Sequence, residues 1–451
     1  MSNFRIQKIQ ITGLFDDINY DINLNEHGPI SIITAPNGRG KTTMLNILAF
    51  VLNPTGENFK AFRGVPFRVF KCFLSNGKTI EFERIAKDRF DKRNPRMART
   101  ITRDPESFRT AFIMNYGDFH YAISSLENRN KGILFSNIVD EFMHEGPEAF
   151  FDADDIEIAY MMRRNRSEFL FRVLERKIVE YLKENDCWKS VNFIRANRIQ
   201  PVTIAPRRSS DYDEYKTQSP LQIACEKISE DIKAATEEYS QAVSQAKDKL
   251  PRMFLEGRGG SLDSKQFLDG WGDYSNELKR FQEIGLIAPT DDFTQGKDIP
   301  SVYETKGQFL STYLEAFKDT TKPLRGIYER LKLFKSILDG RNAITGKKAV
   351  FSKDGISLFV GSREIQLDTL SSGEKHDFIM FYNLIFNIDN NGLVLIDEPE
   401  ISLHIEWQES YLDHLIAICE MNGLQAIVAT HSPNIVSSHY DCLVEKGETH
   451  G

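Results

Sequence analysis

Cysteine and long apolar segments are scarce in this chain. Its 451 residues include five cysteines, an odd number, and these are widely spaced with no CxxC pair among them. Such spacing argues against a zinc ribbon or a disulfide framework and favours reduced thiols. The N-terminal segment alternates polar and apolar residues and lacks the apolar stretch of a signal peptide. Because no apolar run approaches the roughly 20 residues of a membrane span, we expect a soluble, cytoplasmic protein.

An excess of basic charge is also missing. The chain carries 65 acidic and 57 basic residues, for a formal net charge of −8. A field of that sign does not attract DNA, so nucleic-acid binding would need a local basic patch. Residues 84–103 offer such a patch, because they are rich in arginine and lysine, but aspartates are interspersed among them. A solvated loop explains this segment as readily as a DNA contact does, so DNA binding is left open.

A glycine-rich loop follows a short β-branched run at residues 30–34 and precedes a helical pattern at 43–52. The loop fits the phosphate-loop pattern G-x-x-x-x-G-K-[ST], except that Ala35 replaces the first glycine. In such a loop, backbone N–H groups and the N-terminus of the next helix hold a polyphosphate. We predict ATP binding, with Lys41 at the β- and γ-phosphates and the Thr42 hydroxyl on Mg²⁺. The predicted nucleotide-binding residues of the loop are Asn37, Gly38, Arg39, Gly40, Lys41, Thr42 and Thr43.

Two adjacent carboxylates end a second β-like run. Residues 393–396 are consecutive apolar residues, as is typical of a strand buried on both faces of a parallel sheet. Asp397 and Glu398 follow at its C-terminal end, the edge where ligands bind in such sheets. We predict that Asp397 holds Mg²⁺ through water and that Glu398 polarises the attacking water. Alone this pattern is weak, but downstream of a phosphate loop it predicts an ATPase.

Two further short motifs lie on either side of that strand. The first, at residues 370–374, reads Leu-Ser-Ser-Gly-Glu and precedes a helical pattern. By itself it could be a helix N-cap, with a serine as the cap and Glu374 in the first turn. The second, at residues 429–433, is a strand that ends in Thr-His, and a lone histidine there would more often be structural. Their order relative to the phosphate loop and the carboxylates favours functional roles for both.

These four motifs, in this order, resemble those of ABC-type ATPases. The form Leu-Ser-Ser-Gly-Glu is similar to the signature of the SMC, RecF and OLD (overcoming-defect) branches, where transporters carry LSGGQ. In that family the signature binds the γ-phosphate of ATP held by the opposite protomer, and a switch histidine contacts the γ-phosphate. The resemblance covers residues 1–85 and 346–451, and it implies an ATP-sandwich dimer or a higher homo-oligomer with Glu398 and His431 as catalytic residues. The signature residues that it implies are Ser371, Ser372, Gly373 and Glu374.

The loop after the second carboxylate carries a finer resemblance. Residues 397–404 have the form DEPExxLH, which is similar to OLD-like ATPases of bacterial antiphage defence. OLD proteins carry a Toprim nuclease domain after the switch histidine, whereas only residues 432–451 follow it here. The resemblance is therefore to the nuclease-less ATPase subunits of the PARIS, Septu and retron-associated systems. It implies a sensor or regulator that holds and releases a separately encoded nuclease or toxin effector, with a phage protein as its trigger.

The fold class expected from these motifs is α/β. We expect an ABC-type P-loop ATPase head, with a mixed central sheet, helices on both faces and an antiparallel β-subdomain. The head would comprise residues 1–85 and 346–451, interrupted by a mainly helical insertion at 86–345 that contains a short coiled-coil-like hairpin. Residues 228–246 carry its heptad seam, which lasts only about three heptads and so excludes a long SMC-like coiled coil. The glycine-rich residues 256–275 are expected to form a loop.

One ligand expected from the resemblance is missing. ABC ATPases place a glutamine between the phosphate loop and the helical lobe, as a ligand of Mg²⁺ and water. No glutamine occurs here between Gln10 and Gln200. Asn115 and Gln200 are the two candidates for this role, and the coupling between lobe and nucleotide would differ accordingly.

The alternative to a defence ATPase is a RecF- or SMC-like DNA-binding ATPase in DNA repair. Its DNA contact would be the basic segment. The basic residues there are Arg84, Lys87, Arg89, Lys92, Arg93, Arg96, Arg99 and Arg103. An ABC transporter subunit is disfavoured, because its helical insertion would be far shorter than residues 86–345.

Overall fold

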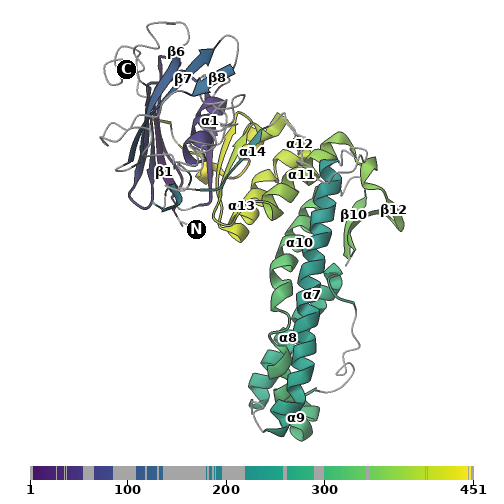
Figure 1. Ribbon diagram of the computed structural model, residues 1–451. Coiled ribbons are helices and arrows are strands. Elements are labelled where there is room, and N and C mark those ends of the chain that lie inside the picture. Colours follow the sequence, from purple (N-terminus) through teal and green to yellow (C-terminus); the bar gives the residue numbers. More distant parts are fainter. Residues whose placement is uncertain are drawn as a thin grey trace, which may run out of the picture. The chain divides into compact units, whose positions relative to one another are not determined.

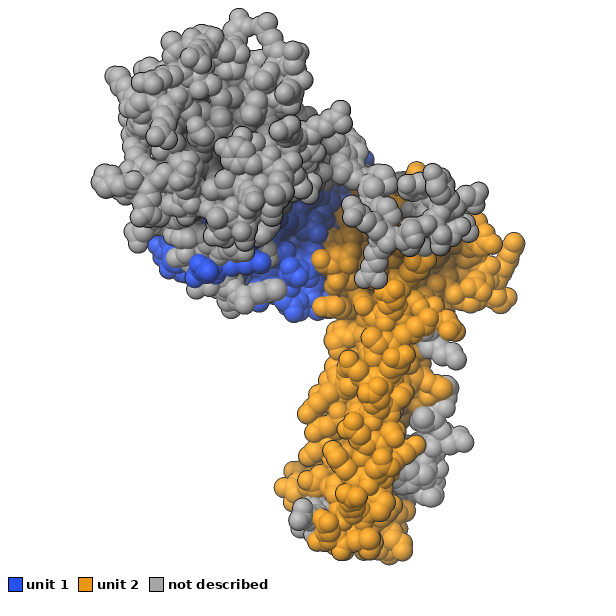
Figure 2. All heavy atoms as spheres, viewed as in Figure 1, with its two compact units in different colours: residues 1–198, 388–451 blue, residues 199–387 orange. Residues whose placement is uncertain are grey.

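The computed structural model divides the chain into two compact units, coloured separately in Figure 2. Unit 1 comprises residues 1–198 and 388–451, and unit 2 comprises residues 199–387. The described residues are 4–26, 28–34, 36, 38–53, 65–84, 108–116, 119–128, 132–135, 179, 182–184, 187, 189–195, 219–256, 262–288, 299–341, 346–352, 354–401, 403, 405–444 and 446–447. Of residues 108–135, the backbone alone is described.

Unit 1 contains an antiparallel sheet with the strand order β15-β2-β1-β4-β5-β6-β7-β8. Figure 1 labels β1, β6, β7 and β8 of this sheet. Its strands are β1 (Ile6–Leu14), β2 (Ile18–Asn23), β4 (Val69–Leu74), β5 (Thr79–Arg84), β6 (Phe108–Tyr116), β7 (Phe119–Asn128), β8 (Gly132–Phe135) and β15 (Lys446–Gly447). The turn between β4 and β5 contains Asn76 and Gly77, and Gly77 has a φ of 81°. A tight hairpin turn requires such a positive φ, which is why Asn-Gly suits this position.

A second sheet of unit 1 is parallel, with the order β3-β14-β13-β9. Its strands are β3 (Ile30–Thr34), β9 (Val191–Arg195), β13 (Leu393–Asp397) and β14 (Gln425–Thr430). All residues of β13 and β14 are buried, as expected for strands covered on both faces. The strands predicted at residues 30–34 and 393–396 are therefore confirmed, and so is the α/β fold class. Since parallel strands share their carboxyl-end edge, the residues that follow β3, β13 and β14 meet there.

Helix α1 (Lys41–Leu52) connects the two sheets of unit 1 through their common core. From Leu45 to Leu52 only Asn46 is not buried, and these side chains share one hydrophobic cluster with residues of β1, β4, β5, β13 and β14. Phe50, for example, meets Phe82 of β5 edge to face, with ring centroids 6.0 Å apart. A helix that is apolar on nearly every side must be covered on every side. This packing fixes the helix N-terminus at the carboxyl edge of the parallel sheet.

Unit 2 consists of helices and a small antiparallel sheet. The helices are α7 (Pro220–Leu255), α8 (Ser264–Ile284), α9 (Ile299–Phe317), α10 (Lys322–Arg341) and α11 (Ser372–Phe386), and the strands are β10 (Lys347–Ser352), β11 (Gly355–Val360) and β12 (Arg363–Ile365). Helix α7 packs against α9 and α10, and α8 packs against α9. In the described part of the chain, no helix combines the length and the apolar character that a membrane crossing requires.

The predicted heptad seam lies on α7 and packs within the chain. Ile228, Ile232 and Ala246 are buried, and the seam positions between them are half-buried. Their partners include α9 and α10 of the same unit. The seam is therefore part of an intramolecular helix bundle.

The glycine-rich residues 256–275, predicted as a loop, are largely helical. Helix α8 begins at Ser264, after a capping box in which Asp263 accepts from the Gln266 N–H and the Gln266 side chain accepts from the Asp263 N–H. Glycine in a helix costs about 1 kcal/mol relative to alanine. Burial of aromatic side chains next to the glycines offsets this cost. These are Phe267, Trp271 and Tyr274.

The predicted domain boundaries at residues 85 and 345 differ from the division in the structure. Strands β6, β7 and β8 continue the antiparallel sheet, and β9 is an edge strand of the parallel sheet, so unit 1 extends to residue 198. At the other end, the signature helix α11 belongs to unit 2, which ends at residue 387. The reason is that sheet membership depends on pairing with distant strands, which the local sequence pattern does not encode. The basic segment lies outside the described residues, apart from Arg84.

Candidate functional site

The predicted phosphate loop lines a cavity of about 240 Å³ in unit 1. Gly38 and Gly40 have φ values of 80° and 82°, a region that glycine adopts without a steric cost. At Gly40 a Cβ atom would lie 2.7 Å from Leu14 Cδ2, so any other residue would require the Leu14 side chain of β1 to shift. The Tyr20 hydroxyl donates a hydrogen bond to the Arg39 carbonyl and holds the loop from β2. The cavity is lined by Phe15, Pro36, Gly38, Arg39, Gly40, Lys41, Thr42, Thr43 and Glu398.

The N-terminus of α1 opens beside this loop without a side-chain cap. Its N-cap residue is Gly40, and no acidic residue occupies the first turn. The first N–H groups of a helix have no partner within the helix and carry a partial positive charge, which favours an anion. The backbone from Gly38 to Thr43 therefore has the geometry that the predicted phosphate loop requires. Asn37, also predicted as a ligand, lies outside the described residues.

Thr42 and Asp397 meet at the end of β13. The Thr42 hydroxyl donates to Asp397 Oδ2 over 2.7 Å, although the two residues are 355 positions apart in the chain. Asp397 is buried. A hydroxyl and a carboxylate are the hard oxygen ligands that Mg²⁺ prefers, so this pair fits the predicted metal role.

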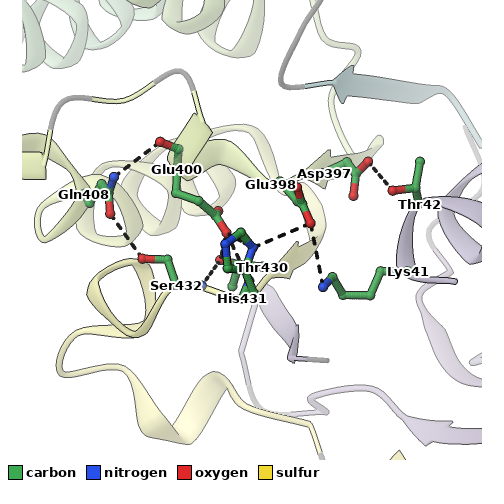
Figure 3. Close-up of polar contacts among 9 residues, drawn as sticks. All are labelled: Lys41, Thr42, Asp397, Glu398, Glu400, Gln408, Thr430, His431 and Ser432. Carbon is green, nitrogen blue, oxygen red and sulfur yellow. Dashed lines mark hydrogen bonds and ion pairs between the residues drawn. The ribbon is translucent and has the colours of Figure 1, made fainter. Parts of the chain in front are cut away.

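Glu398 lies between two nitrogen atoms. Its Oε1 is 3.7 Å from Lys41 Nζ and 3.6 Å from His431 Nδ1, as Figure 3 shows. The residue has a φ of 48°, which is uncommon for a residue other than glycine and costs roughly 1–2 kcal/mol. Its N–H donates to the Ala429 carbonyl over 2.8 Å, and this bond to β14 holds the unusual backbone in place. The structure thus brings the predicted base and the predicted switch histidine together.

Glu400 is a further site residue, which our prediction from the sequence missed. It belongs to the 3-10 turn η4 (Pro399–Ile401), and its side chain is only 7% exposed. Glu400 Oε1 lies 2.9 Å from His431 Nδ1 and accepts from the His431 N–H over 3.0 Å. It also accepts from the Thr430 hydroxyl over 2.8 Å. The signal was available, since Glu400 follows the two predicted carboxylates after one proline in the DEPE segment.

The signature residues lie in unit 2, at the start of α11. Ser371 is the N-cap, and it forms a capping box with Glu374, with bonds of 2.8 and 3.3 Å. Glu374 also pairs with Lys347 Nζ at 2.5 Å. Burial favours a raised pKa for Glu374, but the hydrogen bonds from Lys347 and Ser371 outweigh it and hold this pKa below its ordinary value. Ser371 and Glu374 thus cap the helix. The exposed Ser372 and the adjacent Gly373 are not part of this capping box.

The replacement for the missing glutamine stays a prediction. Asn115 lies in β6, where its backbone pairs with Glu81 of β5, and its side chain is not described. Gln200, the other candidate, lies outside the described residues, as does His404 of the DEPExxLH segment.

The chain is similar to a known protein family and to several solved structures. The sequence matches the AAA ATPase domain family over residues 5–436. Among solved structures, it is similar to the Smc head domain with an extended coiled coil bound to the C-terminal domain of ScpA, from Pyrococcus furiosus, with 14% identity, a TM-score of 0.34 and coverage of 99% of this chain and 96% of that one. It is also similar to an SmcHead bound to the C-winged helix domain of ScpA, with 11% identity, a TM-score of 0.35 and coverage of 99% of this chain and 98% of that one. For the Smc head domain with a coiled coil and joint from Pyrococcus yayanosii, the identity is 12%, the TM-score is 0.30, and the coverage is 99% of this chain and 97% of that one.

Proposed function

Because the chain belongs to the AAA ATPase domain family, it binds and hydrolyses ATP, and we propose that hydrolysis takes place at an interface between two copies of the chain. The observation that supports this most is the division of the motifs. Unit 1 holds the phosphate loop, the Thr42–Asp397 pair and Glu398, whereas unit 2 presents Ser372 at the start of α11. In the proposed assembly, Ser372 of one copy completes the site that unit 1 of the other copy begins.

The contacts within unit 1 suggest how the site would act on ATP. The loop N–H groups and Lys41 would bind the phosphates, and Thr42 and Asp397 would hold Mg²⁺, which supplies positive charge to the phosphate oxygens. Lys41 Nζ lies 3.7 Å from Glu398 Oε1. An ammonium that binds the phosphates would neutralise that carboxylate less, and the carboxylate would then be available to a water molecule. Glu398 would then orient this water and accept its proton.

The proposal is tested by the substitution Glu398→Gln. The amide cannot accept the proton, so hydrolysis should slow by about 100-fold or more, within the usual contribution of a general base. Binding should remain, because the phosphate ligands are intact, and the ATP-bound dimer should accumulate. Mass measurement with and without ATP–Mg²⁺ detects the dimer, and phosphate release gives the rate.

Glu409→Gln is the matched control, because Glu409 is exposed in the same unit and should leave both readouts unchanged. Hydrolysis at the wild-type rate by Glu398→Gln would show that Glu398 is not the base. A variant that is inactive and stays monomeric with ATP would contradict the two-copy site.

At the level of biology, we propose a sensor or regulatory ATPase of bacterial antiphage defence. Its support is the DEPExxLH segment, which resembles the OLD-like ATPases. In this proposal the chain holds a separately encoded nuclease or toxin and releases it in an ATP-dependent manner, with a phage protein as trigger. Co-expression with the product of a neighbouring nuclease or toxin gene tests it. ATP should release the bound effector from the wild-type chain and not from Glu398→Gln. If neither protein retains the effector before ATP is added, the proposed role is refuted.

The second candidate is a DNA-binding ATPase of the RecF or SMC kind. The specific observation in its favour is the basic run at residues 84–103. DNA binding through phosphate contacts weakens steeply with salt. A duplex titration at two salt concentrations, with a variant that replaces Arg93, Arg96 and Arg99 by serine, distinguishes it from the defence role.

A further inference from the structure

Glu400 connects the loop after β13 to the loop after β14. Its Oε1 receives three contacts from the second loop, from the Thr430 hydroxyl, the His431 N–H and His431 Nδ1, at 2.8, 3.0 and 2.9 Å. Its other oxygen, Oε2, is buried and receives no hydrogen bond from the described residues. The carboxylate thus points toward the loop after β14 (Figure 3), and its side chain is only 7% exposed.

These contacts favour one position for the proton on the His431 ring. An ionised carboxylate is an acceptor only, so Glu400 Oε1, which lies 2.9 Å from Nδ1, favours a hydrogen on that nitrogen. Nε2 would then be left for a ligand. Since the ring is 43% exposed, loss of the Glu400 contact would leave it freer to rotate.

Glu400 also competes with the proposed base for the histidine. Nδ1 lies 2.9 Å from Glu400 Oε1 but 3.6 Å from Glu398 Oε1. The ring nitrogen is thus within ion-pair distance of both carboxylates and lies closer to that of Glu400. If Glu400 were absent, Glu398 would be the nearest acceptor for Nδ1–H. A base that already accepts a hydrogen bond from histidine is less able to accept a proton from water.

A second link joins the same two loops. The Gln408 side chain donates to the carbonyls of Glu400 and Leu403, at 3.3 and 3.2 Å. Its oxygen accepts from the Ser432 hydroxyl over 3.1 Å. Glu400 and Gln408 together tie residues 399–408 to residues 430–432. A displacement of the first loop is therefore transmitted to His431.

We propose that Glu400 is a positioning residue for ATP hydrolysis, which holds His431 by its Nδ1–H and keeps this proton away from Glu398. The inference rests on the proposed roles of Glu398 and His431. It goes beyond them, because it assigns a task to a third carboxylate, which acts through the histidine. Its consequence is that Glu400 acts only when His431 is present.

A double-substitution cycle tests this dependence with the full chain. Glu400→Ala should lower kcat by about 10- to 100-fold, the size expected when a catalytic group is displaced, with little change in KM for ATP. Glu400→Gln keeps an oxygen acceptor for Nδ1–H and the shape of the side chain, so its loss should be smaller. In a His431→Ala background, Glu400→Ala should have almost no further effect on kcat, because residues that act through each other are not additive. Glu420→Ala, an exposed glutamate on α13 (Tyr411–Asn422), is the control for lost charge.

A spectroscopic measurement provides a readout besides activity, namely the position of the proton on the His431 ring. The ¹⁵N shifts of histidine distinguish a protonated Nδ1 from an unprotonated one, and the His431→Ala spectrum identifies the His431 signals among the nine histidines. The wild-type chain should show the hydrogen on Nδ1, and Glu400→Ala should shift these signals.

The outcomes separate the inference from the function beneath it. Full additivity of the two substitutions, or unshifted His431 signals in Glu400→Ala, would overturn the role of Glu400 while leaving the roles of Glu398 and His431 intact. Wild-type hydrolysis by His431→Ala would instead remove the histidine from the mechanism, and with it the catalytic task given to Glu400.

Discussion

The carboxylate of Asp377 should be essential for the stability of unit 2. Asp377 on α11 accepts from Arg341 Nη1 on α10 over 2.8 Å, and both side chains are only 4% exposed. The Arg341 guanidinium also lies 4.5 Å from the centroid of the Phe381 ring. Burial raises the pKa of Asp377 to about 6 even beside Arg341, which shows how much solvation the carboxylate gives up.

The magnitude follows from what Asp377→Ala leaves behind. The guanidinium stays buried without its carboxylate, and the removal of one member of a buried pair costs about 3–5 kcal/mol of unfolding free energy. Replacement of both partners by apolar residues of similar volume is often neutral, because neither charge then needs solvation. The double variant Arg341→Met, Asp377→Leu should therefore recover most of the loss.

Urea unfolding of the full chain measures both effects. Trp271 is buried in unit 2, so its fluorescence reports on that unit when the other two tryptophans, Trp188 and Trp407, are replaced by phenylalanine. A loss below about 1 kcal/mol for Asp377→Ala, the range of an exposed pair, would refute the reasoning. So would a double variant that is as unstable as the single one.

Two further predictions concern unit 1. Gly40→Ala should lower the melting temperature of unit 1 more than Gly38→Ala. Both residues have φ near 80°, but the new Cβ meets Leu14 at Gly40 and nothing within 4 Å at Gly38. Equal losses of melting temperature, measured by calorimetry, would mean that backbone strain alone determines the effect. Burial, with a smaller contribution from Arg5, lowers the pKa of Lys189 to about 8 from the ordinary 10.5, so the unfolded chain binds more protons between these values. Stability should therefore rise with pH across this window, by up to about 3 kcal/mol, and a Lys189→Met variant that shows the same rise in urea unfolding would disprove it.

The residues proposed to bind phosphate and metal could be expected to lie together, because their positions follow from the topology. A phosphate loop follows one strand of a parallel sheet, and the carboxylates and the histidine follow two others. Parallel strands end at the same edge, so Lys41 comes together with Asp397 and His431 although hundreds of residues separate it from both. Sequence patterns describe such a site well, because each member is defined relative to its own strand.

Other features depend on contacts that no local pattern contains. Glu400 lies in the same DEPE segment as the predicted base, but its role appears only when β14 brings His431 beside it. The strands β6 to β8 were assigned to a helical insertion, because their membership depends on pairing with β5, as Asn115 pairs with Glu81. In α8, Gly270 suggests a loop, yet a Cβ there would be 3.0 Å from Leu314, so the glycine allows close packing of α8 on α9.

The positive φ of Glu398 implies a conflict between stability and activity at this position. Glycine would adopt the same backbone without strain, so Glu398→Gly should stabilise unit 1 by up to about 1 kcal/mol through relief of that strain. The same change removes the proposed base. A laboratory selection for thermal stability alone would therefore drive the chain toward an inactive protein at this residue, and any engineering of this ATPase must select for turnover and stability together.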